Sequence, residues 1–228
     1  MNVVIITAGG KGSRLSHKFK KQFFKIDNKP LLFWTVDKFV GLNGIEKIII
    51  TLPKTETKKY KELIMSEFHG IDIDVISGGN KRQDSVFEGL KFCPIDTKYV
   101  LIHDGVRPFV ETWEINKLLT EVVNKKAVVP VFKSQNTIKE ISGKQVVKTY
   151  DRSKIVNVAT PQAFDYQILL KYHKKACYEG KYFTDEAAIL EYYGYKVYFI
   201  EGSSKNFKVT NKHDLKIAKT ILENSRSN

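Results

Sequence analysis

Residues 3–15 read VVIITAGGKGSRL, and this stretch does most to decide the fold. Four β-branched residues, Val3 to Ile6, form a short unbroken apolar run, as strands do when both of their faces are covered. The run leads directly into glycines, which let a backbone turn tightly and approach a ligand closely. The stretch therefore predicts a buried strand that ends at a glycine loop.

Similar apolar runs recur along the chain and alternate with stretches of helical spacing. The runs are residues 47–50, 71–76, 99–102, 127–131 and 196–200. Helical spacing is found in residues 30–40, 58–68 and 111–123. This alternation predicts an α/β fold with a doubly wound, mainly parallel, Rossmann-like sheet and helices on both sides. Because no linker, repeat or charge block interrupts the pattern, we expect residues 1–228 to form a single domain.

Residues 137–150 depart from this alternation. They contain two extended runs around a turn at Ser142-Gly143-Lys144, with no helix between them, which is typical of a β-hairpin. A lone hairpin is marginally stable in water and leaves a strand edge unpaired. We therefore expect an arm at about residues 135–155 that packs on a second subunit and forms a homodimer. Packing back onto its own domain remains the alternative.

Composition excludes several classes of protein. The chain has 228 residues, of which 42% are hydrophobic and 28% charged, with 14 Gly and 6 Pro, so disordered and collagen-like classes do not fit. Its length is enough to bury a core without disulfides. The two cysteines, Cys93 and Cys177, show neither metal-binding nor disulfide-framework spacing. No apolar run is long enough to cross a membrane, and we expect a cytoplasmic protein without a membrane partner.

The formal charge of +13 indicates an anionic partner, and the distribution of charge narrows the choice. Residues 11–29 hold six lysines and Arg14 against one acid, Asp27, and glycines interrupt this stretch. A third glycine of a dinucleotide fingerprint is missing at Leu15, and Gly10-Lys11-Gly12 does not match a Walker loop. The pattern favours a phosphate site of another kind, at which Lys20 and Lys21 flank a triphosphate.

Several motifs together resemble the 2-C-methyl-D-erythritol 4-phosphate cytidylyltransferases. The first is Ala8-Gly9-Gly10-x-Gly12-x-Arg14 followed by Lys21-Gln22-Phe23. Further motifs follow in order over about residues 3–220: GGNKRQDSV at 78–86, HDGVRPF at 103–109, DR at 151–152, TPQAF at 160–164, TDEA at 184–187, LEY at 190–192 and NFKVT at 206–210. The resemblance implies a nucleotidyltransferase-type fold and transfer of CMP from CTP to a polyol phosphate.

The resemblance also implies roles for individual residues. Catalysis would fall to Arg14, Lys21 and Lys208, which would stabilise charge at the triphosphate. The nucleotide would be bound by Ala8, Gly9, Gly10, Gly12, Gly79, Asn80, Ser85 and Asp104. The acceptor phosphate would be bound by Arg107, Thr137, Arg152 and Thr160, with Thr137 and Arg152 reaching in from the neighbouring subunit.

Arg and Lys side chains suit the transfer of a nucleotidyl group to a phosphate acceptor. A phosphate monoester is mostly a dianion at neutral pH and needs no general base, so cations that bring two anions together matter most. Mg²⁺ would be bound mainly through the CTP phosphates, and Asp104 and Asp185 are weaker candidates as direct ligands. His103 ends an apolar run and is predicted to be a hydrogen-bonded core residue. The aromatic residues at 192–199 are also predicted to lie in the core.

Two alternatives to the methylerythritol activity remain. HDGVRPF, where the family more often has HDAAR, together with the AGGxGSR loop, also resembles ribitol-5-phosphate cytidylyltransferases. TDEA and LEY favour the methylerythritol enzyme. A basic nucleic-acid-binding protein is an alternative of a different class, in which binding would weaken steeply with salt and CTP would be irrelevant. No known nucleic-acid motif supports it.

Overall fold

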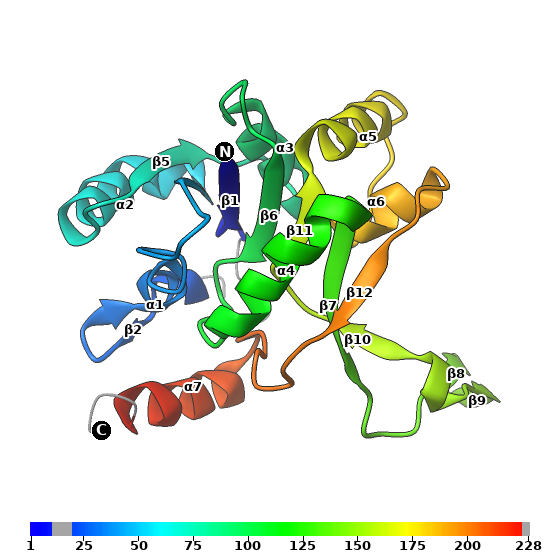
Figure 1. Ribbon diagram of the computed structural model, residues 1–228. Helices are drawn as coiled ribbons and strands as arrows, with labels where there is room; N and C mark the ends of the chain where they lie inside the picture. The colour runs from blue at the N-terminus through cyan, green and yellow to red at the C-terminus, as the bar shows by residue number, and fades with distance from the viewer. Residues whose placement is uncertain (11–19, 225–228) are drawn as a thin grey trace.

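The structure, a computed structural model, describes residues 1–10 and 20–224. Among these residues, eight strands form one sheet in the spatial order β10-β7-β11-β6-β1-β4-β5, with β12 also paired to β7 (Figure 1). Their bounds are β1 Asn2–Thr7, β4 Lys47–Leu52, β5 Asp72–Ser77, β6 Tyr99–Asp104, β7 Ala127–Lys133, β10 Val156–Val158, β11 Gln162–Asp165 and β12 Tyr198–Glu201. All six predicted runs are strands, and the predicted fold class is confirmed.

Four parallel strands, β5, β4, β1 and β6, form the part of the sheet that carries the glycine loops. Ile5 of β1 pairs with Ile49 on one side and Ile102 on the other. Val3, Val4, Ile5 and Ile6 are all fully buried, which explains why β1 is an unbroken apolar run rather than an alternating one. The chain moves from β1 to β4 and β5 on one side and then returns to β6 on the other, which opens a crevice at the carboxyl ends of β1 and β6.

Two strands of the main sheet, β10 and β11, were not expected from the sequence. β11 lies antiparallel between β6 and β7, and β10 continues along the same side of β7. Val158 pairs with Val131, and Ala163 pairs with Val128. Between these two pairs the chain advances five residues along β10–β11 but only three along β7. The two extra residues form an interruption at Thr160-Pro161, whose peptide bond is cis. The interruption releases Thr160 from the ladder and places its hydroxyl against β6.

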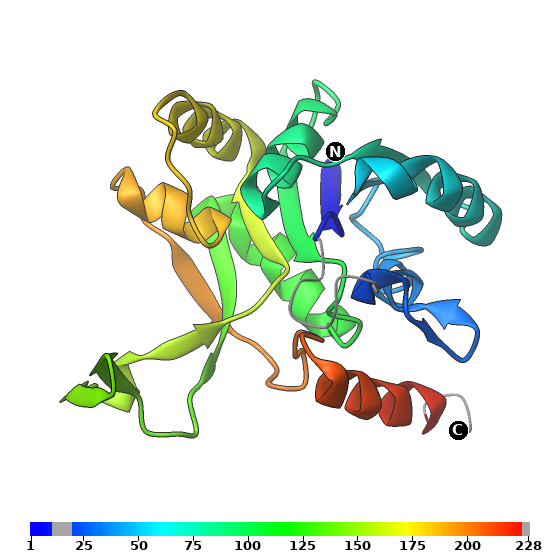
Figure 2. The same cartoon turned by 180° about the vertical axis from the view of Figure 1, so that it is seen from behind.

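Helices cover both faces of the sheet. α1 Leu31–Val36, α2 Lys54–Glu67 and α4 Thr112–Lys125 pack on one face, together with Val4, Ile6 and Ile48. α3 Arg82–Lys91, α5 Tyr166–Tyr178 and α6 Glu186–Tyr192 pack on the other, together with Val3 and Ile5. α7 Lys212–Asn224 packs beside α1 below the sheet (Figures 1 and 2). The short elements near the first loop are the turn η1 Lys21–Phe23 and the strands β2 Lys25–Ile26 and β3 Lys29–Pro30.

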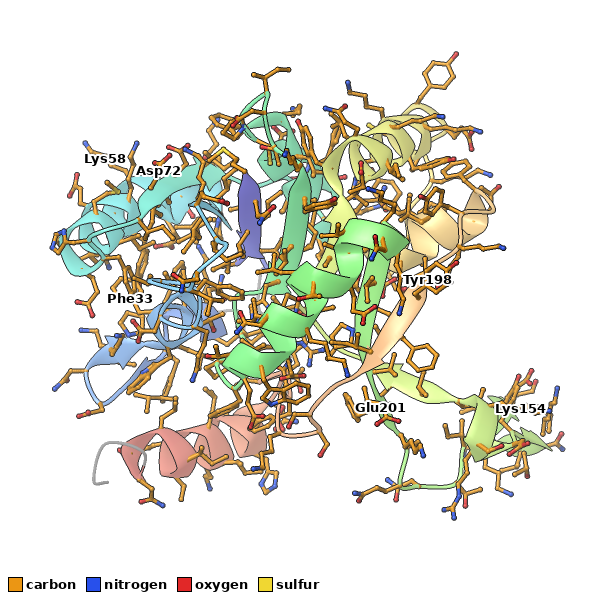
Figure 3. The ribbon with its side chains drawn as sticks, in the orientation of Figure 1. Phe33, Lys58, Asp72, Lys154, Tyr198 and Glu201 are labelled. Atoms are coloured by element: carbon orange, nitrogen blue, oxygen red, sulfur yellow. The ribbon has the colours of Figure 1, made fainter. Side chains whose placement is uncertain are left out.

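The expected hairpin is present and extends from the body of the molecule (Figures 1 and 2). β8 Lys139–Ser142 pairs antiparallel with β9 Gln145–Thr149, and the turn between them holds Gly143 at a positive φ of 57°. The turn η2 Arg152–Lys154 follows, and Lys154 lies among the outlying side chains of the arm in Figure 3. Apolar side chains on the hairpin remain exposed, with Ile141 at 68% and Val146 at 62%.

The prediction that the aromatic residues at 192–199 lie in the core is wrong for three of them. Tyr192, Tyr198 and Phe199 are exposed, Phe199 to 61%. β12 is the last strand on its side of β7, and three of its four side chains are exposed, with Ile200 alone of the four buried. Tyr198, labelled in Figure 3, lies on β12 at the same side of the sheet as the arm.

Both cysteines are free thiols, and burial raises the pKa of Cys93 to about 12. No helix within the described residues has the length and apolar character to span a membrane.

Candidate active site

A cavity of about 260 Å³ lies at the carboxyl ends of β1 and β6. This is the crevice in which open α/β sheets bind ligands. Its walls come from the loops after β1, β5 and β6, from η1 and from the segment that precedes α7. The lining residues are Thr7, Ala8, Gly9, Gly10, Lys21, Gln22, Asn80, Lys81, Arg82, Ser85, Asp104, Val106 and Lys208.

Two glycine loops meet at Ser85 on α3. A Cβ on Gly9 would lie 3.0 Å from Ser85 Oγ, and one on Gly78 would lie 2.7 Å from it, so both backbones approach closer than side chains would allow. Gln22 fixes the first loop, because its Nε2 donates to the carbonyl oxygens of Ala8 at 2.7 Å and Gly10 at 3.1 Å. The loops therefore present backbone groups and one hydroxyl to a ligand.

Gly79 is required by packing, and this gives a prediction about stability. A Cβ at position 79 would lie 2.3 Å from Asp84 Cβ, whereas one at Gly10 meets nothing within 4 Å. We expect Gly79→Ala to destabilise the protein by about 1–3 kcal/mol and to lower the Tm by about 2–4 °C per kcal/mol. Gly10→Ala is the matched control and should leave the Tm unchanged. Equal melting temperatures for the two variants in thermal unfolding would contradict the prediction.

Asp104, at the end of β6, is the centre of the cationic site. Its Oδ1 accepts from Arg82 Nε at 3.1 Å, and its Oδ2 lies 2.9 Å from Lys208 Nζ and 3.3 Å from Arg107 Nε. Burial alone would raise the pKa of Asp104, but Arg82, Lys208 and Arg107 hold it well below its usual range. Asp104 is therefore charged at any pH at which the protein would be assayed.

His103 and Thr160 form a buried pair behind Asp104. His103 Nε2 lies 3.1 Å from the carbonyl oxygen of Arg107, which makes Nε2 the protonated nitrogen. Thr160 Oγ1 then donates to His103 Nδ1 at 3.1 Å and accepts from the Asp104 backbone N–H at 3.1 Å. The expected core role of His103 is confirmed by this geometry.

Asn206 joins this pair to the loop that carries Lys208. The side-chain Nδ2 of Asn206 donates to the backbone carbonyl oxygen of Thr160 at 2.8 Å. The backbone carbonyl oxygen of Asn206 accepts from Arg107 Nη1, also at 2.8 Å. Asn206 is fully buried. It therefore holds Arg107 and Thr160 together with Lys208, two residues further along the chain.

The two buried histidines, His103 and His173, should make the folded protein less stable in acid. Burial lowers the pKa of His103 to about 4, and burial, with a further contribution from Arg82, lowers that of His173 to about 3. Histidines of the unfolded chain bind protons below about pH 6.5, whereas these two stay neutral in the fold. Stability should therefore fall between about pH 6.5 and pH 4, by up to about 1.4 kcal/mol per pH unit for each ring.

His173→Phe tests this prediction. Both ring nitrogens of His173 lack a hydrogen-bond partner, and the ring stacks on Phe87 at a centroid distance of 6.0 Å, so Phe fits the site chemically. Chemical denaturation between pH 5 and 7 should show about half the wild-type slope of stability against pH. His213→Ala, at an exposed position, should leave the slope unchanged. An unaltered slope in His173→Phe would refute the assignment.

The structure brings most of the predicted site residues together. Eight of them line the cavity: Ala8, Gly9, Gly10, Lys21, Asn80, Ser85, Asp104 and Lys208. Gly79 lies in the same loop as Asn80, and Arg107 and Thr160 contact Asp104. Thr137 and Arg152 lie exposed on the arm, outside the cavity of their own chain. Gly12 and Arg14 lie outside the described residues.

Lys20 and Lys21, which the sequence places side by side, have different surroundings. Lys21 lines the cavity, whereas Lys20 Nζ lies 2.7 Å from Glu56 Oε1 and 3.1 Å from Thr55 Oγ1 at the start of α2. The expectation that both lysines flank the triphosphate is therefore not met by Lys20 in this structure.

Sequence reasoning gave no role to four residues of the site. These are Gln22, Arg82, Glu186 and Asn206. Each lies inside a motif quoted above, but as a polar residue that acts through another residue or through the backbone. Spacing alone gave no signal for such contacts, because they join elements far apart in the chain.

The carboxylates near the cavity are already engaged. Asp104 contacts three cationic side chains, and Asp185 caps α6 through Ala188 N–H at 3.0 Å while accepting from Gln162 Nε2 at 2.8 Å. Within residues 1–10 and 20–224 no group of three or more His, Cys, Asp or Glu side chains could hold a metal. The Asp104 and Asp185 carboxylates are thus engaged by cations and hydrogen-bond donors of this chain.

Glycine loops and cations around a crevice of a doubly wound sheet define a nucleotide-binding α/β protein of the nucleotidyltransferase class. Comparison with known families narrows the class. Residues 2–224 match the family described as IspD, 2-C-methyl-D-erythritol 4-phosphate cytidylyltransferase. The chain belongs to this family, and it is a CTP-dependent nucleotidyltransferase.

Individual relatives agree with this membership. The enzyme of that name from Clostridium novyi (strain NT) is 36% identical over 228 residues, covering 99% of this chain and 98% of the relative. That from Clostridium perfringens (strain 13 / Type A) is 39% identical over 227 residues, covering 97% and 98%. The crystal structure of 4-diphosphocytidyl-2C-methyl-D-erythritol synthase from Anaerococcus prevotii superposes with a TM-score of 0.87 at 29% identity, covering 98% and 96%. Neither the ribitol phosphate nor the nucleic-acid alternative is favoured by these similarities.

Proposed function

We propose that this chain transfers CMP from CTP to 2-C-methyl-D-erythritol 4-phosphate, giving 4-diphosphocytidyl-2-C-methyl-D-erythritol and pyrophosphate for isoprenoid biosynthesis, and that the cavity between β1 and β6 is the reaction site. The observation that carries the site assignment is the cationic lining by Lys21, Arg82 and Lys208 beside two glycine loops. The direct test is pyrophosphate release from CTP, Mg²⁺ and the acceptor. No release by the folded protein would refute the proposal.

The proposed reaction is an in-line displacement. An oxygen of the acceptor phosphate attacks the α-phosphorus of CTP, a new P–O bond forms, and the bond to the pyrophosphate group breaks. The acceptor phosphate is mostly dianionic at neutral pH, so no base has to remove a proton. His103 is neutral and both of its nitrogens are occupied, which fits a site without a proton shuttle.

Charge stabilisation is assigned to the cations. Lys21 and Lys208 both line the cavity and would neutralise charge that develops on the α-phosphoryl oxygens and the leaving pyrophosphate. Arg14 is assigned the same role from its motif. Lys208 contacts Asp104 at 2.9 Å, and this contact holds its ammonium group at the cavity.

The nucleotide is assigned to the two loops and to Asp104. Backbone groups of Ala8, Gly9, Gly10, Gly12, Gly79 and Asn80 and the Ser85 hydroxyl would frame the cytosine and phosphates. Asp104 would accept from a hydroxyl of the ribose or of the acceptor. In this proposal Mg²⁺ enters with CTP, held mainly by its phosphate oxygens, and reduces their negative charge.

The acceptor phosphate is assigned to Arg107 and Thr160 of one chain and to Thr137 and Arg152 of a second copy. The arm supports a homodimer because it exposes Ile141, Val146 and Val147. Further apolar side chains are exposed on strands that pair with β7: Val156 and Val158 of β10 and Phe199 of β12. Such a surface favours burial against another protein surface.

The cytoplasmic location, the single domain and the absence of a nucleic-acid partner stay predictions.

Acceptor choice gives a separate prediction. We expect a higher kcat/KM for methylerythritol phosphate than for ribitol phosphate at fixed CTP and Mg²⁺. Ribitol phosphate lacks the branching methyl group of methylerythritol phosphate and carries a further hydroxyl group. An apolar notch that fits the methyl group would favour methylerythritol phosphate by about 1–3 kcal/mol, and a site whose polar groups pair with the hydroxyl groups of one acceptor would discriminate by more. Steady-state rates with both acceptors measure the ratio. A ratio in favour of ribitol phosphate would overturn the acceptor while leaving cytidylyl transfer in place.

A further inference from the structure

A buried carboxylate outside the cavity contacts one of its cations. Glu186, the first residue of α6, is fully buried, and its Oε1 and Oε2 lie 2.9 Å and 2.8 Å from Arg82 Nη1. The Nε of the same guanidinium donates to Asp104 Oδ1 at 3.1 Å. The three side chains thus form a continuous chain from α6, through the first residue of α3, to the end of β6.

The segment before Glu186 is anchored to the body independently of this chain. Gln83 Nε2 donates to the carbonyl oxygen of Lys181 at 3.0 Å, and Gln83 Oε1 accepts from the Phe183 N–H at 2.8 Å. Asp185 caps α6 and accepts from Gln162. The two Asp185 contacts fix the start of α6, which carries Glu186, so its carboxylate keeps a defined position whether or not Gln83 holds residues 181–183.

Stability alone is a weak explanation for this arrangement. Taking two charges out of water costs free energy that the ion pair often only just offsets, and apolar side chains of similar size can be as stable or more stable. Here burial raises the pKa of Glu186, against the opposing effect of Arg82. An ion pair at this position does have a consequence for geometry, because Arg82 also lines the cavity.

Arg82 needs a second partner in order to hold Asp104. An arginine side chain has many rotamers, and its planar fork is fixed when two of its sides are bound. With Glu186 on Nη1, the Nε–H points at Asp104 Oδ1, and Oδ2 is left for Lys208 and Arg107. Without Glu186, the guanidinium would be free to turn toward the cavity or the solvent, and Asp104 would lose its contact on Oδ1.

We propose that Glu186 is a positioning residue for the transfer reaction: it fixes Arg82, which holds the Asp104 carboxylate where the nucleotide binds. This inference rests on the proposed function. Glu186 itself does not line the cavity, and it would act on the substrate indirectly, by holding Arg82. The same carboxylate would therefore be needed for turnover with either polyol phosphate.

The test is a double-mutant cycle on kcat/KM for CTP, measured by pyrophosphate release. Activity of the wild-type protein tests the proposed function, and the ratios among variants test the role of Glu186. Glu186→Gln should lower kcat/KM by about 10- to 100-fold, as expected when a reacting group is displaced by about 1 Å. Arg82→Met should lower it as well. In the double variant, which removes both buried charges, kcat/KM should equal that of Arg82→Met within about twofold.

Controls separate positioning from loss of folding. Gln83→Ala loosens the same 181–183 segment but leaves Glu186 and Arg82 in place, and it should keep kcat/KM within about twofold of wild type even if the Tm falls. Glu186→Asp keeps the buried charge and shortens its reach, so it should fold and lose about tenfold in kcat/KM. If Glu186→Gln does not fold, Glu186→Asp and the comparison of the double variant with Arg82→Met decide the question. The proposal is wrong if Glu186→Asp retains wild-type kcat/KM, or if adding Glu186→Gln to Arg82→Met lowers activity further.

Discussion

Replacing Lys21 with Ala should lower kcat by about 10²–10³-fold without unfolding the protein, since one preorganised charge-stabilising donor contributes about that much. Lys21 lies in the turn η1, which Gln22 anchors to the first glycine loop, so its backbone position does not depend on the ammonium group. The measurement is pyrophosphate release at saturating CTP and acceptor, alongside the Tm of the variant.

Lys20→Ala is the matched control, because it removes the same charge one residue earlier. Lys20 contacts Glu56 and Thr55 instead of the cavity, and a partly exposed ion pair of this kind contributes at most about 1 kcal/mol. Its kcat should stay close to that of wild type. Similar losses in both variants would mean that net positive charge near the loop, and not the placement of Lys21, drives the reaction.

Replacing Arg152 with Ala should raise the KM for the polyol phosphate by about 10²-fold and leave the KM for CTP nearly unchanged. Truncating one partner of a desolvated charge pair costs about 2–5 kcal/mol, and the lower part of that range corresponds to this factor. Within its own chain Arg152 is exposed and donates only weakly, to the carbonyl oxygen of Gln135 at 3.4 Å. Lys154→Ala, in the same turn, is the control and should change neither KM.

Mixed dimers extend this test to the proposed subunit arrangement. A dimer with one Arg152→Ala chain and one Lys21→Ala chain would have one site with both defects and one with neither. At an acceptor concentration far below the raised KM of Arg152→Ala, both parent variants turn over slowly, and mixing them should restore about one working site per heterodimer. If mixing restores nothing although subunits exchange, Arg152 does not act across a dimer.

The fold could be predicted from sequence where a strand is buried on both faces. Val3–Ile6 and the other parallel strands are unbroken apolar runs, and Gly143 marks the hairpin turn. β10 and β11 could not be predicted this way, since they are three and four residues long and an interruption at Thr160-Pro161 separates them. Their pairing with β7 and β6 is decided by tertiary contacts.

Sequence motifs brought out residues that would touch a ligand in the family pattern and gave no sign of the residues that hold them in place. Lys21, Ser85, Asp104 and Lys208 lie in distinctive motifs and meet at one cavity. The roles of Gln22 and Asn206 depend on distances across the fold, to the carbonyl oxygens of Ala8 and Thr160. The exposed position of Phe199 on β12 was also missed, because spacing along a strand does not tell which face is covered.

Asp104, which three cationic side chains surround, serves as the internal counter-ion of this cluster. Arg82, Arg107 and Lys208 can lie close together because the carboxylate offsets their mutual repulsion. Under the proposed function, binding of CTP would be an exchange of anions, in which phosphates take Lys208 from Asp104 Oδ2 while Arg107 remains on that oxygen. Affinity for the nucleotide would then reflect the difference between two anionic partners, and inorganic anions of similar charge would compete with it.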